Sequence, residues 1–211
     1  MKKVLLLGDS IRMGYCKYVK MAFDGAAEIV YPEDCCRFSA YMLRYLGTWK
    51  AETGCDETLD AVHWNAGLWD VLRLLDDEVQ TTPEEYRRNI DRICKVLRMQ
   101  YPNAKLIFAT STAVQEHLYT GYKRYNADIR TYNRIATEAV LSNGGLINDL
   151  YAVTEGIAED HYSDPTHFNT MRGTKLIAEK VVSVLQDMLG VPAKALDYHA
   201  LFEAQKKIVG I

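Results

Sequence analysis

A serine that follows the first apolar stretch of the sequence could act as a nucleophile. Gly8-Asp9-Ser10 lies between Val4–Leu7, which is typical of a buried strand, and Ile11–Phe23, which is typical of a helix. At such a corner the serine hydroxyl is exposed, and its backbone N–H has no partner inside the helix. That N–H and the helix dipole favour negative charge on a reacting oxygen. The alternative is that Ser10 or Asp9 only caps the helix.

An acid and a histidine stand close together in Asp164-Pro165-Thr166-His167. A carboxylate three residues before an imidazole can lie on the same side of one turn. It could then accept a hydrogen bond from one ring N–H and leave the other nitrogen facing a serine, which is how an acid orients a catalytic base. The alternative is a simple turn with a surface histidine, since Asp-Pro commonly starts turns.

A third polar segment, Asn65-Ala66-Gly67-Leu68-Trp69-Asp70, follows the apolar stretch Ala61–Trp64. A glycine and a side-chain amide at this place could bind an oxyanion next to the serine. The alternative is that Asn65 and Asp70 cap or brace the turn, and for Asp70 this structural role is favoured.

Strand-like and helix-like segments alternate along the chain and could bring these three segments together. The predicted strands are Val4–Leu7, Glu28–Tyr31, Ala61–Trp64, Lys105–Ala109 and Leu146–Asn148. The predicted helices are Ile11–Phe23, Phe38–Leu46, 83–100, Asp128–Leu141 and Thr170–Leu189, with one more in the tail. This alternation predicts an α/β fold, a three-layer α/β/α sandwich around a five-stranded parallel sheet. Ligands bind such sheets at the carboxyl ends of the strands, where all three polar segments fall.

Composition narrows the classes of function. A net charge of −3 argues against a nucleic-acid partner, and no apolar run approaches the roughly 20 residues of a membrane span. The five cysteines are odd in number and lack zinc-ligand spacing, which favours free thiols in a cytoplasmic protein, with a reactive Cys35-Cys36 pair as the alternative. No metal or other cofactor is predicted. Residues 1–190 are expected to form one domain, and residues 191–211 a helical extension packed on that domain or on a partner, for instance in a homo-oligomer.

The order and spacing of these segments resemble the SGNH (GDSL-type) hydrolases over residues 4–190. Gly8-Asp9-Ser10 is similar to the first sequence block of that family, and Asp164-x-x-His167 to the last. The stretch from Tyr125-Asn126 to Tyr132-Asn133-Arg134 resembles bacterial carbohydrate-esterase-like members. The resemblance implies a flavodoxin-like sandwich, a Ser10–His167–Asp164 triad, and an oxyanion hole that includes the Ser10 N–H.

Two positions depart from the family pattern. The glycine of the second block, whose N–H joins the oxyanion hole, falls on Cys36 when counted back from the following helix. The third block, Gly-x-Asn-Asp in the family, reads Gly67-Leu68-Trp69-Asp70 here, so tryptophan replaces the oxyanion asparagine. Either the Trp69 indole N–H or the Asn65 amide could supply the missing donor, and Asn65 is preferred.

The sequence therefore predicts a serine hydrolase that cleaves small carboxylic esters, with acetyl or other short acyl groups on carbohydrates as the expected substrates. A lysophospholipase or thioesterase, a catalytically weak member that binds glycans or proteins, and an unrelated flavodoxin-like binding module are the alternatives. Side chains expected at the substrate are Asp9, Trp69, Asp70, Tyr119 and His161. Tyr119, Tyr122 and Tyr125 form either an aromatic wall or the packing of a long loop, and His63, within a strand, is expected in the core.

Overall fold

The computed structural model describes residues 1–209, with side chains through residue 205, and its centre is a single parallel sheet. The strand order is β2-β1-β3-β4-β5, and every neighbouring pair is parallel. The chain moves outward from β1 to β2 and then crosses back to β3, so the topology changes direction between β1 and β3. The strands are β1 (Lys2–Leu7), β2 (Ala27–Val30), β3 (Ala61–Trp64), β4 (Lys105–Ala109) and β5 (Leu146–Asn148).

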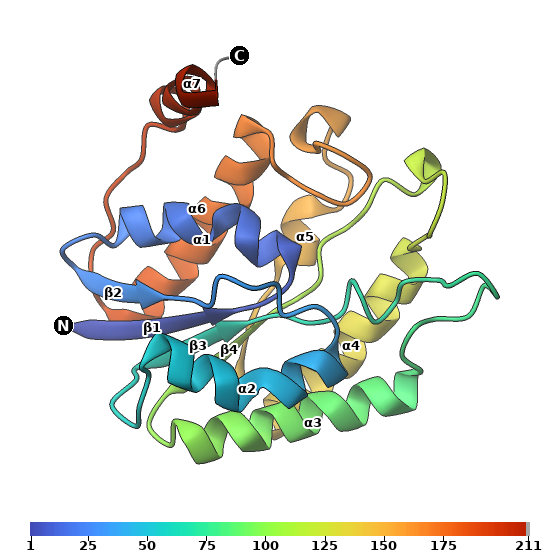
Figure 1. Cartoon of the computed structure of the whole chain (residues 1–211), viewed down its shortest axis with the longest axis horizontal. Coiled ribbons are helices and arrows are strands. Elements are labelled where there is room, and N and C mark those ends of the chain that lie inside the picture. Colours follow the sequence, from blue (N-terminus) through green and yellow to red (C-terminus); the bar gives the residue numbers. More distant parts are fainter. Residues whose placement is uncertain (210–211) are drawn as a thin grey trace.

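Helices cover both faces of this sheet, which confirms the predicted three-layer α/β/α architecture (Figure 1). One face carries α1 (Ser10–Ala22), α5 (Leu150–Thr154) and α6 (Met171–Leu189). The other face carries α2 (Ser39–Thr53), α3 (Pro83–Gln100) and α4 (Asn126–Ser142). Two short 3₁₀ helices, η1 (Glu116–Leu118) and η2 (Glu159–His161), lie in the loops that follow β4 and α5.

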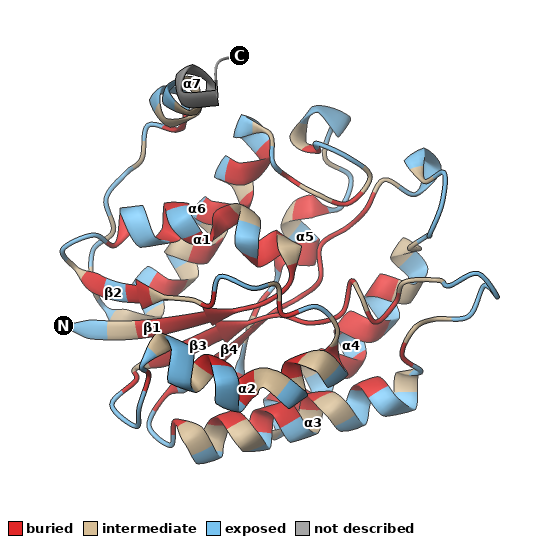
Figure 2. Ribbon diagram, viewed as in Figure 1, coloured by how far each residue is buried: buried red, intermediate tan, exposed pale blue. Residues whose placement is uncertain are grey.

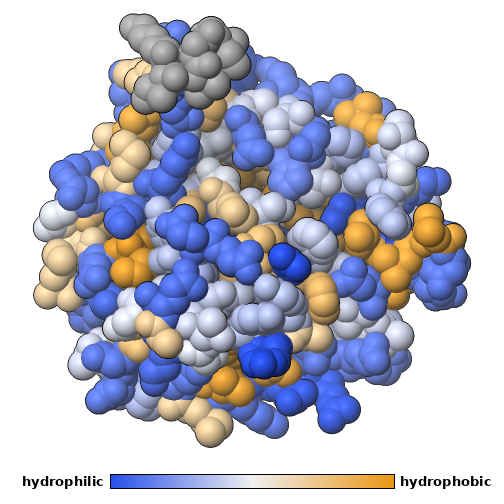
Figure 3. Space-filling model, in the orientation of Figure 1, coloured by the Kyte–Doolittle hydropathy of each residue, from blue (hydrophilic) through white to orange (hydrophobic). Residues whose placement is uncertain are grey.

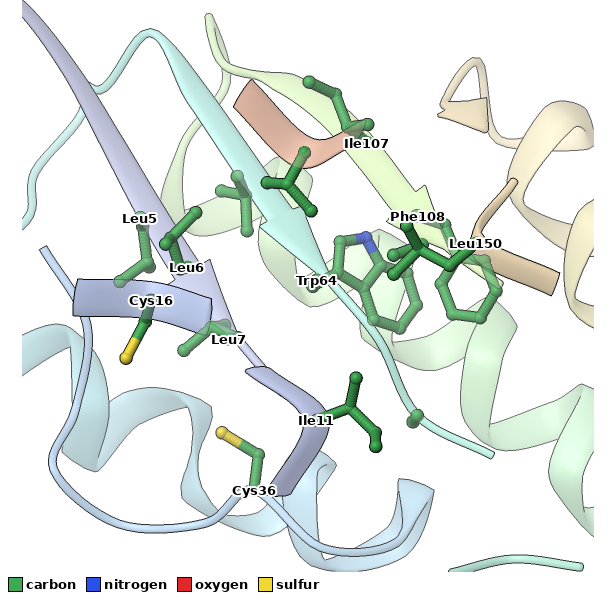
Figure 4. Packing of buried hydrophobic residues seen from close by; sticks show 14 of the residues in the cluster. Leu5, Leu6, Leu7, Ile11, Cys16, Cys36, Trp64, Ile107, Phe108 and Leu150 are labelled. Atoms are coloured by element: carbon green, nitrogen blue, oxygen red, sulfur yellow. The ribbon is translucent and has the colours of Figure 1, made fainter. Parts of the chain in front are cut away.

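The core lies on both sides of the central strands, which are buried along most of their length (Figure 2). Trp64 packs edge-on against Phe108 with 4.8 Å between the ring centroids (Figure 4). His63 is also fully buried, as predicted, between the Tyr15 hydroxyl at 3.4 Å and the Asn148 amide at 3.0 Å. Burial lowers the pKa of His63 to about 4.

The register of β1 against β3 places the ends of these two strands side by side. Leu7 pairs with Trp64, so the residues that follow each strand, Gly8 and Asn65, emerge together at the carboxyl edge of the sheet. A Cβ atom on Gly8 would lie 1.9 Å from the Asn65 Oδ1, so only glycine allows this close approach. The two loops that carry candidate site residues are therefore in direct contact.

The chain after α6 leaves the sandwich. α6 ends at Gly190, which has a left-handed φ of 66°. The extended segment 191–197 leads to α7 (Tyr198–Val209), where Tyr198 and Phe202 pack on Tyr18 of α1 (Figure 1). The last two residues of the extension expected from the sequence lie outside the described part of the chain.

The surface is mostly hydrophilic in the view of Figure 3, with apolar atoms gathered where the loop between β3 and α3 protrudes. Leu74 and Leu75 on this loop are 41% and 93% exposed. No helix within the described residues is long and apolar enough to cross a membrane.

Candidate active site

Ser10 is the first residue of α1 and stands at the carboxyl end of the central strand β1. Asp9, not Ser10, is the N-cap residue, because its carboxylate accepts a hydrogen bond from the Ile11 N–H at 3.0 Å. The Ser10 hydroxyl is therefore not used for capping, and its backbone N–H, at the first helical position, has no intrahelical acceptor. Both groups are available for chemistry.

A tight turn presents His167 towards this serine. The Asp164 carboxylate accepts the backbone N–H groups of Thr166 at 2.8 Å and His167 at 2.9 Å, which folds the segment back on itself. The loop is held in place from outside by Gln115, whose N–H donates to the Pro165 carbonyl at 2.8 Å. α6, which begins soon after this turn, packs against α1, and this packing brings the turn that carries His167 to the helix that carries Ser10.

Ser10, His167 and Asp164 form one hydrogen-bonded chain. The His167 Nε2 lies 2.7 Å from the Ser10 Oγ, and the His167 Nδ1 lies 2.8 Å from one Asp164 oxygen and 3.0 Å from the other. Partial burial raises the pKa of Asp164, but hydrogen bonds from the backbone and from His167 outweigh it, and the net shift is downward. An ionised carboxylate can only accept, so the proton sits on Nδ1 and the Nε2 lone pair faces the Ser10 hydroxyl.

The structure contradicts the prediction that the Cys36 N–H is free to bind an oxyanion. That N–H donates to the Gly8 carbonyl at 2.9 Å, and the Cys36 side chain is fully buried in the hydrophobic core (Figure 4). The bond ties the loop between β2 and α2 to the corner that carries Ser10. Cys36 thus has a structural role at the site.

The next residue, Arg37, adopts a backbone conformation usually reserved for glycine. Its φ is 48°, in the left-handed region, while its side chain lies over the Tyr41 ring at 4.7 Å. Its backbone N–H faces the thiol of Cys35, whose pKa is raised by burial and partly lowered by that N–H. Nothing in an arginine signals such a left-handed turn, so this conformation could not be predicted from the sequence.

The preference for Asn65 as an oxyanion donor stays a prediction. Asn65 is 4% exposed, its Oδ1 has no hydrogen-bond partner, and its side chain is among the groups that lower the pKa of the buried Asp9. Trp69 is partly exposed, and its indole N–H makes no hydrogen bond to any described residue. Both side chains therefore remain candidate donors.

Two acids expected at the substrate are buried structural groups. Asp9 is fully buried, and burial raises its pKa despite hydrogen bonds from Asn65 and Ile11. Asp70 is fully buried as well, and it accepts the Ser39 N–H at 3.0 and 3.1 Å and the Ser39 hydroxyl at 2.6 Å at the start of α2. Desolvation raises the pKa of Asp70 to about 6. The prediction that Asp9 and Asp70 contact the substrate is therefore wrong. Both carboxylates brace the loops instead.

The tyrosines beyond β4 have separate partners. Tyr119 bonds to the Thr166 hydroxyl at 2.7 Å and so braces the turn that carries His167. Tyr125 lies next to Arg73, and Tyr122 is 55% exposed. These contacts agree with loop packing for Tyr119 and Tyr125, while contact of Tyr119 with the substrate stays a prediction.

His161 is bonded within its own 3₁₀ turn. Its Nδ1 lies 3.2 Å from the Ala158 carbonyl and 3.0 Å from an Asp160 oxygen. No hydrogen bond joins the His161 ring to the three residues of the chain described above. Its expected position at the lip of the pocket stays a prediction.

A small apolar cavity adjoins Ser10 and His167 between α1 and α6. Its volume is about 10 Å³, close to one water-sized sphere, and Phe168 and Ile177 are among its walls. A wider groove of about 820 Å³ lies between η1, α4 and α5 and contains neither Ser10 nor His167. Within the described part of the chain, no three His, Cys, Asp or Glu side chains are grouped to hold a metal ion.

Solved structures share this fold at low sequence identity. A lipase/acylhydrolase from Enterococcus faecalis is 21% identical with a TM-score of 0.68, over 93% of this chain and all of the other. The acetylxylan esterase Axe2 from Geobacillus stearothermophilus is 15% identical with a TM-score of 0.68, over 86% and 93% of the two chains. A GDSL-like lipase from Bacteroides thetaiotaomicron is 15% identical with a TM-score of 0.66, over 88% of each chain.

No protein-family model and no curated protein sequence matches the chain. The structural neighbours nevertheless confirm the fold expected from the resemblance. The chain has the SGNH/GDSL hydrolase fold, with a serine, a histidine and an aspartate hydrogen-bonded at the carboxyl edge of its sheet.

Proposed function

We propose that the protein is a serine hydrolase that cleaves carboxylic esters through an acyl-enzyme, with Ser10 as nucleophile, His167 as base and Asp164 as the group that orients it. The observation that carries this proposal is the unbroken hydrogen-bonded chain from the Asp164 carboxylate through His167 to the Ser10 hydroxyl. A nucleophile and base within hydrogen-bond reach, with the base oriented by a third group, are the general signature of nucleophilic catalysis.

The proposed reaction has two acyl-transfer steps. The Ser10 Oγ attacks the ester carbonyl carbon while the His167 Nε2 takes the hydroxyl proton, and Asp164 offsets the charge of the imidazolium. When the tetrahedral intermediate collapses, the C–O bond to the alcohol breaks and His167 returns the proton to the leaving oxygen. Water, deprotonated by His167, then attacks the acyl-enzyme and releases the acid with Ser10 restored.

The proposed oxyanion hole differs from the one expected from sequence. The Ser10 N–H, at the first helical position of α1, is the first donor. The indole N–H of Trp69 is the second, in the place where the related family has an asparagine, and the Asn65 amide is the alternative to it. Each such donor is worth about 10²–10³ in turnover, so the replacement of the asparagine bears directly on rate.

Short acyl groups are the proposed substrates. The cavity beside Ser10 is small, about 10 Å³, which supports acetyl esters over long-chain lipids. Acetylxylan esterases among the structural neighbours support an acetylated carbohydrate as the alcohol portion. All five cysteines are free, which supports the proposed cytoplasmic location.

Removal of the nucleophile tests the function. Ser10→Ala should abolish hydrolysis of p-nitrophenyl acetate and labelling by a fluorophosphonate probe, whereas Ser183→Ala, at an exposed serine of α6, should leave both unchanged. Full activity in Ser10→Ala would refute the proposed mechanism. A wild-type protein that neither hydrolyses the ester nor reacts with the probe would instead favour a glycan- or protein-binding role.

Acyl length tests the substrate class. With p-nitrophenyl acetate, butyrate and octanoate, kcat/KM should fall as the chain outgrows the cavity. A maximum at octanoate would favour the lysophospholipase alternative, and faster turnover of an acetyl thioester than of the oxygen ester would favour the thioesterase alternative. Release of acetate from acetylated xylan then tests the carbohydrate portion.

A further inference from the structure

Arg12 is a buried cation two residues after Ser10 in α1. Its side chain is 1% exposed, and no carboxylate of the described residues forms an ion pair with it. Its Nη1 donates to the Pro32 carbonyl at 2.9 Å and its Nη2 to the Asp34 carbonyl at 2.5 Å, while its Nε has no partner. Burying a charge without an opposite charge is costly, so a residue that only filled space here would be better apolar.

The two bonds from Arg12 act on the loop that precedes α2. Together with the bond from the Cys36 N–H to the Gly8 carbonyl, they fasten residues 32–36 to the corner between β1 and α1 at three points. Arg37 follows at once with its left-handed φ of 48°. For a residue with a Cβ this conformation costs roughly 1–2 kcal/mol, and it persists only where the surroundings over-determine it.

We propose that Arg12 is a positioning residue, which fixes the carbonyls of Pro32 and Asp34 and so holds the loop before α2 against the strand-to-helix corner where Ser10 reacts. This inference rests on the proposed ester hydrolysis. The nucleophile and the arginine belong to the first turn of one helix. The helix that starts at the serine therefore also sets the loop that faces it.

The planar fork of a guanidinium suits this role, because two nitrogens at a fixed separation hold two carbonyls in a fixed relation. Lysine keeps the charge but has a single nitrogen, so Arg12→Lys should loosen the loop without removing the cation. The chain offers a matched control in Arg98, whose Nη1 and Nη2 donate to the carbonyls of Ala104 at 3.0 Å and Gly144 at 2.8 Å. Those carbonyls precede β4 and β5, at the edge of the sheet opposite Ser10.

The experiment compares the wild type, Arg12→Lys and Arg98→Lys. Thermal midpoints, kcat and KM for p-nitrophenyl acetate, and the inhibition constant of phenylboronic acid are measured for each protein. A boronic acid becomes tetrahedral and anionic when the serine oxygen adds to boron, so its affinity reports on the oxyanion hole. Hydrogen exchange of peptides covering residues 33–38 reports on the loop itself.

In Arg12→Lys we expect kcat to fall roughly 10- to 100-fold, less than for outright loss of a donor, with KM changed by less than about threefold. The inhibition constant of phenylboronic acid should rise by a similar factor, and the amide hydrogens of residues 33–38 should exchange faster. Arg98→Lys should lower the thermal midpoint without changing kcat, the boronic acid constant or that exchange.

An Arg12→Lys protein that melts earlier but matches Arg98→Lys in kcat and boronic acid affinity would overturn the positioning role. If Arg12→Lys does not fold, Arg12→Gln, which can still donate to one carbonyl, is measured in its place against the same criteria. Failure of the proposed function has a different signature, because Ser10→Ala would then be as active as the wild type.

Discussion

Replacing Asp164 by asparagine isolates the orientation of His167 from the fold of its loop. The asparagine Oδ1 can still accept the backbone N–H groups of Thr166 and His167, which the carboxylate accepts at 2.8 and 2.9 Å. Its Nδ2, however, can only donate, and it would face the His167 Nδ1. That nitrogen must then be the acceptor, the ring proton moves to Nε2, and Nε2 can no longer accept from the Ser10 hydroxyl.

The wrong tautomer should reduce kcat by about 10⁴, which corresponds to roughly 5.5 kcal/mol in activation free energy. Stability should change by less than about 1 kcal/mol, because the Asp164 side chain is 46% exposed and exposed ion pairs contribute little. The assay is steady-state hydrolysis of p-nitrophenyl acetate, with urea unfolding to follow stability.

Asp149→Asn is the matched control. Asp149 is also an aspartate at the carboxyl edge of the sheet, where it caps α5 by accepting the Ala152 N–H at 3.1 Å, but it does not contact His167. The kcat of the Asp149→Asn protein should stay within twofold of the wild-type value. An Asp164→Asn protein that keeps kcat within tenfold of the wild type would refute the assigned role of this acid.

Two further predictions concern stability. The pKa of His63 is about 4 in the fold against an ordinary 6.5, so the stability that the neutral ring contributes is present above pH 6.5 and is lost as pH falls towards 4. In urea unfolding, the free energy of unfolding of the wild type should fall by roughly 3 kcal/mol more than that of His63→Asn between pH 7 and pH 4. Equal decreases in the two proteins would show that the His63 ring is not buried in its neutral form. Arg37→Gly should be about 1 kcal/mol more stable than Arg37→Ala, because both lose the contact with Tyr41 and only glycine relieves the positive φ. An alanine variant of equal stability would contradict the strained conformation.

Local sequence patterns predicted most of the fold. The bounds of β3, β4 and β5 agree with the prediction, because each is a short apolar run between clear breaks. The helix predicted at Phe38–Leu46 instead runs over Ser39–Thr53, since its later residues lack the apolar spacing that marked its start. The five-residue α5 was not predicted, because so short a segment has no periodicity to detect.

The candidate site was predictable only where its geometry is local. Asp164 and His167 lie in one turn, and the spacing between them was enough to suggest their contact. The oxyanion donors depend instead on contacts between distant segments. The Cys36 N–H, for example, donates to the carbonyl of Gly8, which is 28 positions earlier in the sequence, so this contact could not be found from the residues alone.

The two reacting side chains stand 157 positions apart in the sequence, and this separation links chemistry to folding. Ser10 belongs to the first strand-to-helix corner, whereas His167 comes just before α6, whose packing on α1 closes the site. Closing so long a loop has an entropic cost that must be met before the contact forms. A partly folded chain would therefore expose its serine without a base and be chemically silent. On refolding, turnover should return no earlier than the docking of α6, which makes the proposed activity a reporter of that docking.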